Sequence, residues 1–170
     1  MRLGLATIAI ALLLSGCAAD PYPLPSGPPN AGQQNPAAVG EPIHAVLIYL
    51  QVRPGDRIEL LGGEPIGSID GASVRFLLSR PVIEDNGVHV IGKEFEDLDG
   101  AVVTAGSASP GPDDTVGIAA ELTAERPGRF EVTGVRLRYR LNGGGEQVGE
   151  GIDVVWTVCA DDPEPADCPE

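Results

Sequence analysis

Apolar and polar side chains alternate with a period of two between Phe130 and Val158. Every second residue from Val135 to Leu141 is apolar, and the residues between them are arginines. The same alternation returns from Ile152 to Val158, after a glycine-rich stretch. A period of two places one set of side chains on a buried face and the other in water, which is the pattern of a β-strand. We therefore expect an antiparallel hairpin whose long tip spans residues 142–151.

The alternation changes phase once within the first of these strands. Phe130 and Val132 are apolar at even positions, whereas the apolar residues from Val135 onwards stand at odd positions. Both sets can face one core only if an extra residue near Thr133 resets the phase. We predict a β-bulge at Gly134.

Further segments rich in β-branched and aromatic residues lie between residues 43 and 159, separated by turns rich in Pro, Gly and Asp. The 23 glycines and 16 prolines of the chain favour strands and turns over long helices. Seven or eight short strands then predict one antiparallel β-sandwich domain over residues 43–159. The segments are residues 44–52, 57–61, 72–79, 87–91 and 115–123, of which the last also suits a short helix.

The C-terminal part of this region resembles immunoglobulin-like and fibronectin-like modules. The resemblance rests on a turn containing Pro-Gly at Arg126–Arg129, followed by an aromatic residue, a strand, a hairpin and a second strand. It implies an all-β, immunoglobulin-like antiparallel sandwich. The cysteine pair that joins the two sheets of antibody domains is absent, and we identify no named family for this body.

The N-terminus has the organisation of a bacterial secretion signal. Arg2 precedes an apolar run from Leu3 to Leu14, which is too short to cross a bilayer as a helix. Leu14-Ser-Gly-Cys17 resembles the lipobox of bacterial lipoproteins, which implies cleavage after residue 16 and acylation of Cys17. We expect an extracytoplasmic protein attached to a membrane through lipid on Cys17. The alternative is an ordinary signal peptide with an incidental cysteine.

Residues 17–42 contain the predicted lipidated cysteine and then a proline-rich stretch without periodic hydrophobicity. Such a composition buries too little apolar area to offset the entropy of ordering the chain. We expect a disordered tether that holds the body away from the lipid headgroups. The alternative, a proline-rich ligand for another protein, lacks a flanking basic residue.

The chain is strongly acidic, with 25 Asp and Glu against 11 Lys and Arg, a formal charge of −14. Removal of residues 1–16 takes away Arg2 and no acid, so the mature charge is −15. Nucleic-acid binding needs clustered excess cation, so we expect no nucleic-acid partner. Residues 160–170 hold five of the acids.

Two cysteines remain after acylation of Cys17. Cys159 and Cys168 flank the start and end of the acidic tail. An even pair of cysteines in an oxidising compartment predicts a disulfide, which would tie residues 160–170 to the last strand. A redox pair or an intermolecular bond are the alternatives.

No catalytic constellation stands out. The only imidazoles, His44 and His89, lie within apolar strand segments and suit structural roles better than general-base catalysis. We therefore expect a protein that is not an enzyme and carries no cofactor. Asp97 and Asp99 precede Gly100 as in the middle of a calcium loop, but the first and last ligand positions do not match. They remain weak Ca²⁺ candidates, together with the scattered acids Asp113, Asp114, Asp161 and Asp162.

Arg136, Arg138 and Arg140 form a basic stripe on an acidic chain. One hypothesis is a docking patch for a protein or an anion. The other is neutralisation by acids on neighbouring strands, such as Asp153.

These features leave three functional hypotheses. The first is a non-enzymatic binding module of the cell envelope with a protein or envelope component as partner. The second is a solute- or ion-binding accessory protein, which predicts a concave apolar pocket with converging polar groups. The third is a spacer with no ligand.

Overall fold

The structure is a computed structural model that describes residues 22, 24, 31–83, 89–105 and 114–161. These residues form two extended β-sheets and a short ribbon, which confirms the prediction of an all-β protein. No helix in this part of the chain is long and apolar enough to span a bilayer.

The first sheet, called sheet A, has the strand order β1-β12-β10-β3-β8, with β11 also paired to β10. Its strands are antiparallel except for β1, which runs parallel to β12. The strands of sheet A are β1 (Ala31–Ala38), β3 (Arg57–Ser68), β8 (Val102–Thr104), β10 (Gly128–Leu141), β11 (Glu146–Gly151) and β12 (Val154–Asp161).

The second sheet, called sheet B, has the order β2-β9-β4-β7 and is antiparallel throughout. Its strands are β2 (Pro42–Gln51), β4 (Ala72–Ser79), β7 (Glu96–Asp97) and β9 (Thr115–Ala124), and a separate ribbon pairs β5 (Val82–Ile83) with β6 (His89–Val90). Residues 115–124 are therefore a strand and not the helix that their composition also allowed. Apolar side chains from both sheets form one core between them.

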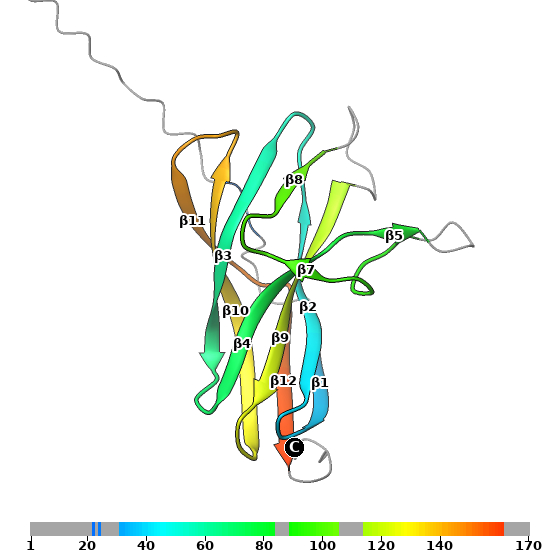
Figure 1. The fold of residues 1–170 in the computed structure, drawn as a ribbon, viewed down its shortest axis with the longest axis vertical. Helices are drawn as coiled ribbons and strands as arrows, with labels where there is room; N and C mark the ends of the chain where they lie inside the picture. Colours follow the sequence, from blue (N-terminus) through cyan, green and yellow to red (C-terminus); the bar gives the residue numbers. More distant parts are fainter. Residues whose placement is uncertain (1–21, 23, 25–30, 84–88, 106–113, 162–170) are drawn as a thin grey trace, which may run out of the picture.

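The turns gather at two opposite ends of the molecule. The turns β2–β3 and β10–β11 lie at one end, drawn at the top of Figure 1. The turns β1–β2, β3–β4 and β9–β10 lie at the other, where the last described residue is also found. We call these the upper end and the lower end.

The predicted bulge in β10 is confirmed. Val132 pairs with Gly67 of β3 and Gly134 pairs with the preceding residue, Ile66, so Thr133 is the additional residue. The extra residue changes the phase of the alternation as the pattern required. As a result the apolar side chains on both sides of the bulge are buried in the same core, namely Phe130, Val132, Val135, Leu137 and Tyr139.

The predicted hairpin is present, but its tip is much shorter than expected. Residues 128–132 of β10 pair with β12, and residues 135–140 pair with β11, which occupies most of the predicted loop 142–151. The turn itself covers residues 142–145. Asn142 and Gly143 both have positive φ (53° and 73°), which matches the right-handed twist of the two strands. The sequence predicts a loop at residues 146–151 because their polar, glycine-containing composition is typical of loops, whereas the structure has a strand there.

The prediction of a disordered tether over residues 17–42 is wrong for its second half. Residues 31–38 form β1 along the edge of β12, and β2 begins at Pro42. The indole Nε1–H of the fully buried Trp156 donates a hydrogen bond to Asn35 Oδ1 (2.9 Å), and Ala37 is buried. Main-chain pairing and this bond offset the ordering entropy on which the prediction relied. The predicted signal peptide (residues 1–16), Cys17 and residues 162–170 lie outside the described residues.

Substitution of Asn35 tests whether β1 is part of the fold. Asn35→Ala leaves a buried indole N–H without an acceptor, so we expect the free energy of unfolding to fall by about 1–3 kcal/mol in chemical denaturation. In a Trp156→Phe background the same substitution should cost little, because the donor is gone. Gln34→Ala, at an exposed position on the same strand, is the control. An equal effect of the two alanines would contradict the docking of β1.

Candidate functional site

The outer face of sheet A carries the predicted arginine stripe. Alternation along β10 points Arg136, Arg138 and Arg140 away from the core, and each is a little under half exposed. Arg136 lies between two glutamates: Glu150 of β11 at 2.7 Å and Glu64 of β3 at 3.6 Å. The hydrogen bond with Glu150, followed by its charge, raises the pKa of the Arg136 guanidinium.

The middle arginine lies across the neighbouring strand. Gly62 of β3 pairs with Arg138 and has φ +134°, and a side chain at this position would collide with the guanidinium. Arg138 donates to the carbonyl oxygen of Leu61 (3.0 Å) and lies 3.7 Å from Glu146. On its other side it faces Val148 of β11, a large apolar residue that is 54% exposed.

The third arginine, Arg140, pairs with Glu59 of β3 at 3.5 Å. The face thus consists of a column of arginines on β10 between glutamates on β3 and β11, with Val148 between the two glutamates of β11. We call these eight residues the arginine face: Glu59, Glu64, Arg136, Arg138, Arg140, Glu146, Val148 and Glu150. Each arginine has an acidic neighbour, as the neutralisation hypothesis expected.

Asp153 is not one of those neighbours, contrary to the sequence-based suggestion. It lies between β11 and β12, where the chain leaves β10 and approaches sheet B. Its backbone N–H donates to the carbonyl oxygen of Leu47 (2.9 Å), and its carboxylate accepts the backbone N–H of Tyr49 (3.0 Å). Asp153 therefore connects the two sheets.

A second polar cluster lies on the outer face of sheet B. Glu121 of β9 accepts hydrogen bonds from Arg75 of β4 and from His44 Nε2 of β2 (2.8 Å), while the His44 ring stacks on Phe95 with centroids 4.9 Å apart. The bond from Arg75 is the main cause that lowers the pKa of Glu121; partial burial opposes it, and His44 adds to it. These contacts tie His44 of β2 to β9 and to Phe95. The side chain of His89 lies outside the described residues.

The weak calcium candidates are not brought together. Asp97 is 83% exposed and lies 3.9 Å from Arg75, and Asp99 is exposed in the turn after β7. Asp114 is buried, whereas Asp161 ends β12 and is exposed. Among the described residues no three His, Cys, Asp or Glu side chains converge as metal ligands. Asp113 and Asp162 lie outside those residues.

The predicted disulfide stays a prediction. Cys159 is buried near the end of β12, and Cys168 lies outside the described residues. The acylated residue proposed from the sequence, Cys17, lies outside them as well.

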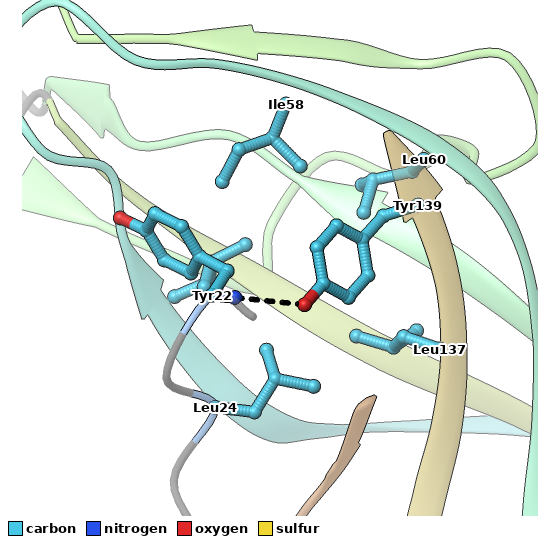
Figure 2. A pocket seen from close by; sticks show the side chains of 7 residues that line it. Tyr22, Leu24, Ile58, Leu60, Leu137 and Tyr139 are labelled. Atoms are coloured by element: carbon cyan, nitrogen blue, oxygen red, sulfur yellow. Dashed lines mark hydrogen bonds between the residues drawn. The ribbon is translucent and has the colours of Figure 1, made fainter. Parts of the chain in front are cut away.

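Sequence reasoning missed a third feature, an apolar slot near the upper end between the sheets. Tyr22 and Leu24 enter it from the supposed tether (Figure 2). Their side chains fill it so closely that no space for a water molecule remains. Two isolated apolar residues among prolines are the only sequence signal for this feature. The slot is completed by Leu50, Ile58, Leu60, Leu137 and Tyr139.

No family model and no curated protein matches this sequence. Among solved structures, it is similar to the Proteus mirabilis ambient temperature fimbriae adhesin AtfE, with 14% identity over 82% of this chain and 99% of that chain. The TM-score is 0.29, and at this level the likeness supports no argument about fold or function.

The pH dependence of stability tests the cluster around Glu121. Its pKa is lowered in the folded state, so its carboxylate stabilises the fold at neutral pH, and this contribution is lost as the pH falls through the lowered value. We expect Glu121→Gln to be less stable than the wild type at pH 7, with the difference shrinking as the pH falls below the ordinary glutamate pKa of about 4.3. Chemical denaturation across this range measures it. Glu125→Gln, in an exposed turn, is the control; a constant difference at every pH would contradict the assignment.

Proposed function

We propose that this protein is a lipid-anchored, non-enzymatic interaction module of the cell envelope, built on an immunoglobulin-like sandwich. The observation that carries the proposal is the arginine face. It is a regular, solvent-exposed surface on one face of a sheet, and its arginines and glutamates are paired with one another. Such a surface suits contact with another macromolecule better than capture of a small molecule.

The strand order supports the immunoglobulin-like part of the proposal. In immunoglobulin domains the second, fifth and fourth strands are adjacent in one sheet, and the seventh, sixth and third in the other. Taking β2, β3, β4, β9, β10 and β12 as the second to seventh strands gives β2-β9-β4 and β12-β10-β3, the orders found here. The segment from β5 to β8 is then an insertion between the fourth and fifth strands.

The arginines of the arginine face can form ion pairs with carboxylates of a partner. Surface ion pairs contribute only about 0–1 kcal/mol each, so exchanging a glutamate of this face for a partner's carboxylate costs little. Arginines bind carboxylates in well-defined geometry, and Val148 of β11 adds an apolar contact point beside them. A protein surface that carries acidic groups next to an apolar group is the kind of partner that fits.

The solute-binding alternative predicts an apolar pocket with converging polar groups. The apolar slot between the sheets is filled by Tyr22 and Leu24. This slot therefore leaves no room for a solute.

Lipid anchoring is tested by acylation of the intact chain. In a bacterium that processes lipoproteins, we expect the protein to incorporate a labelled fatty acid and to sediment with membranes. Cys17→Ala should lose both properties, because the thiol that accepts the lipid is gone, whereas Cys168→Ser should keep them. Label retained in the Cys17 variant, or absent from the wild type, would contradict the anchor.

The interaction surface is tested by photocrosslinking in intact cells. A photoreactive residue at Val148 should give a product of defined mass that Arg136→Ser, Arg138→Ser and Arg140→Ser together abolish. The matched control, Arg75→Ser with Arg80→Ser and Arg126→Ser, removes three exposed arginines elsewhere and should leave the product intact. Thermal unfolding checks that both triple variants are folded.

A probe at Tyr49, which is 48% exposed at the edge of sheet B, shows whether the contact is specific. The same product from residue 49, or a product that survives loss of the three stripe arginines, would exclude the arginine face as the docking site. No product at either position would favour the spacer hypothesis.

A further inference from the structure

Tyr22 is held in the body of the protein by three hydrogen bonds. Its hydroxyl donates to the carbonyl oxygen of Gln51 (2.6 Å) and accepts the backbone N–H of Arg53 (2.9 Å). Its own backbone N–H donates to the hydroxyl of Tyr139 (2.9 Å), as Figure 2 shows. The guanidinium of Arg53 lies 5.2 Å from the centre of the Tyr22 ring, so the β2–β3 turn encloses this side chain.

Burial agrees with this bonding. Tyr22 is only 5% exposed, and burial is the main cause that raises the pKa of its hydroxyl. Leu24 is 9% exposed and packs against Gly149 of β11, where an added Cβ would lie 2.7 Å from Leu24 Cδ1. The segment around residues 22–24, which we call the N-terminal clamp, is thus fixed to the body near the upper end.

The position of the clamp sets how far the body can lie from its anchor. Five residue steps separate Cys17 from Tyr22, and a fully extended chain of that length spans at most about 18 Å. A free tether over residues 18–42 would instead reach roughly 75 Å. After the clamp the chain continues into β1, which runs beside β12 towards the lower end (Figure 1).

We infer that the upper end of the sandwich is a membrane-facing surface, which rests against lipid headgroups, and that the lower end is presented away from the membrane. This inference rests on the proposed lipid anchor at Cys17 and adds an orientation to it. The acyl chains enter the bilayer within about 18 Å of Tyr22, whereas a ten-residue strand places the lower end roughly 33 Å farther away.

The charges of the described turns agree with this orientation. The upper turns, residues 52–56 and 142–145, carry one arginine, Arg53, and one acid, Asp56, and are neutral in sum. The lower turns, residues 39–41, 69–71 and 125–127, carry three acids and one arginine. Lipid phosphates attract cationic groups and repel anionic ones, so the upper end meets the headgroups more favourably.

Energy transfer to a headgroup-linked acceptor in vesicles tests the orientation. The full-length lipoprotein carries a fluorophore on a cysteine introduced either by Gly145→Cys, in the upper turn 142–145, or by Glu125→Cys, at the lower end. We expect markedly higher transfer from residue 145. Equal transfer from the two positions, or higher transfer from residue 125, would overturn the inference.

Two insertions distinguish a clamped N-terminal segment from a free tether, and neither changes the sequence of the body. About twelve flexible Gly/Ser residues placed between Ala19 and Asp20 lengthen the path from anchor to clamp, and transfer from residue 145 should fall. The same insertion between Ser26 and Gly27 lies beyond the clamp, so transfer should not change. Equal effects of the two insertions would show that Tyr22 does not hold the body, and would overturn the inference.

Failure of the orientation and failure of the anchor give different results. Mass spectrometry of the purified protein shows whether Cys17 carries lipid. A protein without lipid that does not bind vesicles refutes the proposed anchor and, with it, the membrane-facing surface. A lipidated, vesicle-bound protein with equal transfer from both ends refutes only the orientation.

Discussion

The additional residue Thr133 in β10 is the constraint on which the rest of this fold depends. Without it, either the first half of the strand or the second would turn its apolar side chains to water, because the side-chain period of a strand is two. With it, the apolar side chains on both sides of the bulge in this fourteen-residue strand face the core. The strand that pairs with β10 on the side away from β3 also changes at this point, from β12 to β11. The two residues between those strands reach across to sheet B, where Asp153 bonds to β2 beside a second irregularity at Leu47.

The same alternation that buries one side of β10 builds the arginine face on the other. Because β3 and β11 flank β10 and both place glutamates outwards, the basic stripe is balanced within its own face. The acidity of the protein is therefore not offset by a separate basic patch on this sheet. The proposed partner would therefore meet a patterned, locally neutralised surface, and specificity would come from the arrangement of charges more than from their sum.

The described part of the N-terminal segment has a different role from the spacer that its composition predicts. Low hydrophobicity and many prolines are typical of a chain that stays disordered, and that argument holds for a segment in isolation. Here the body offers an unpaired strand edge, a buried indole N–H and an apolar slot, and residues of the segment satisfy each of them. The described residues of a segment that composition assigns to a spacer are instead docked on the body.

Local pattern alone determined the all-β class, the bulge near Gly134, the antiparallel pairing at the C-terminal end and the outward direction of the three arginines. These follow from the side-chain period and from turn chemistry, which act over a few residues. Tertiary contacts decided the strands β1 and β11, the extension of β3 through Gly62 and Gly63, and the acids that neutralise the arginine face. Gly62 makes room for Arg138 and Gly63 for Phe76 of the opposite sheet, so glycines typical of a loop are required within a strand. The burial of Tyr22 was also decided by tertiary contacts. Its hydrogen-bond partners stand 29 to 117 positions away in the sequence, and only folding brings them together.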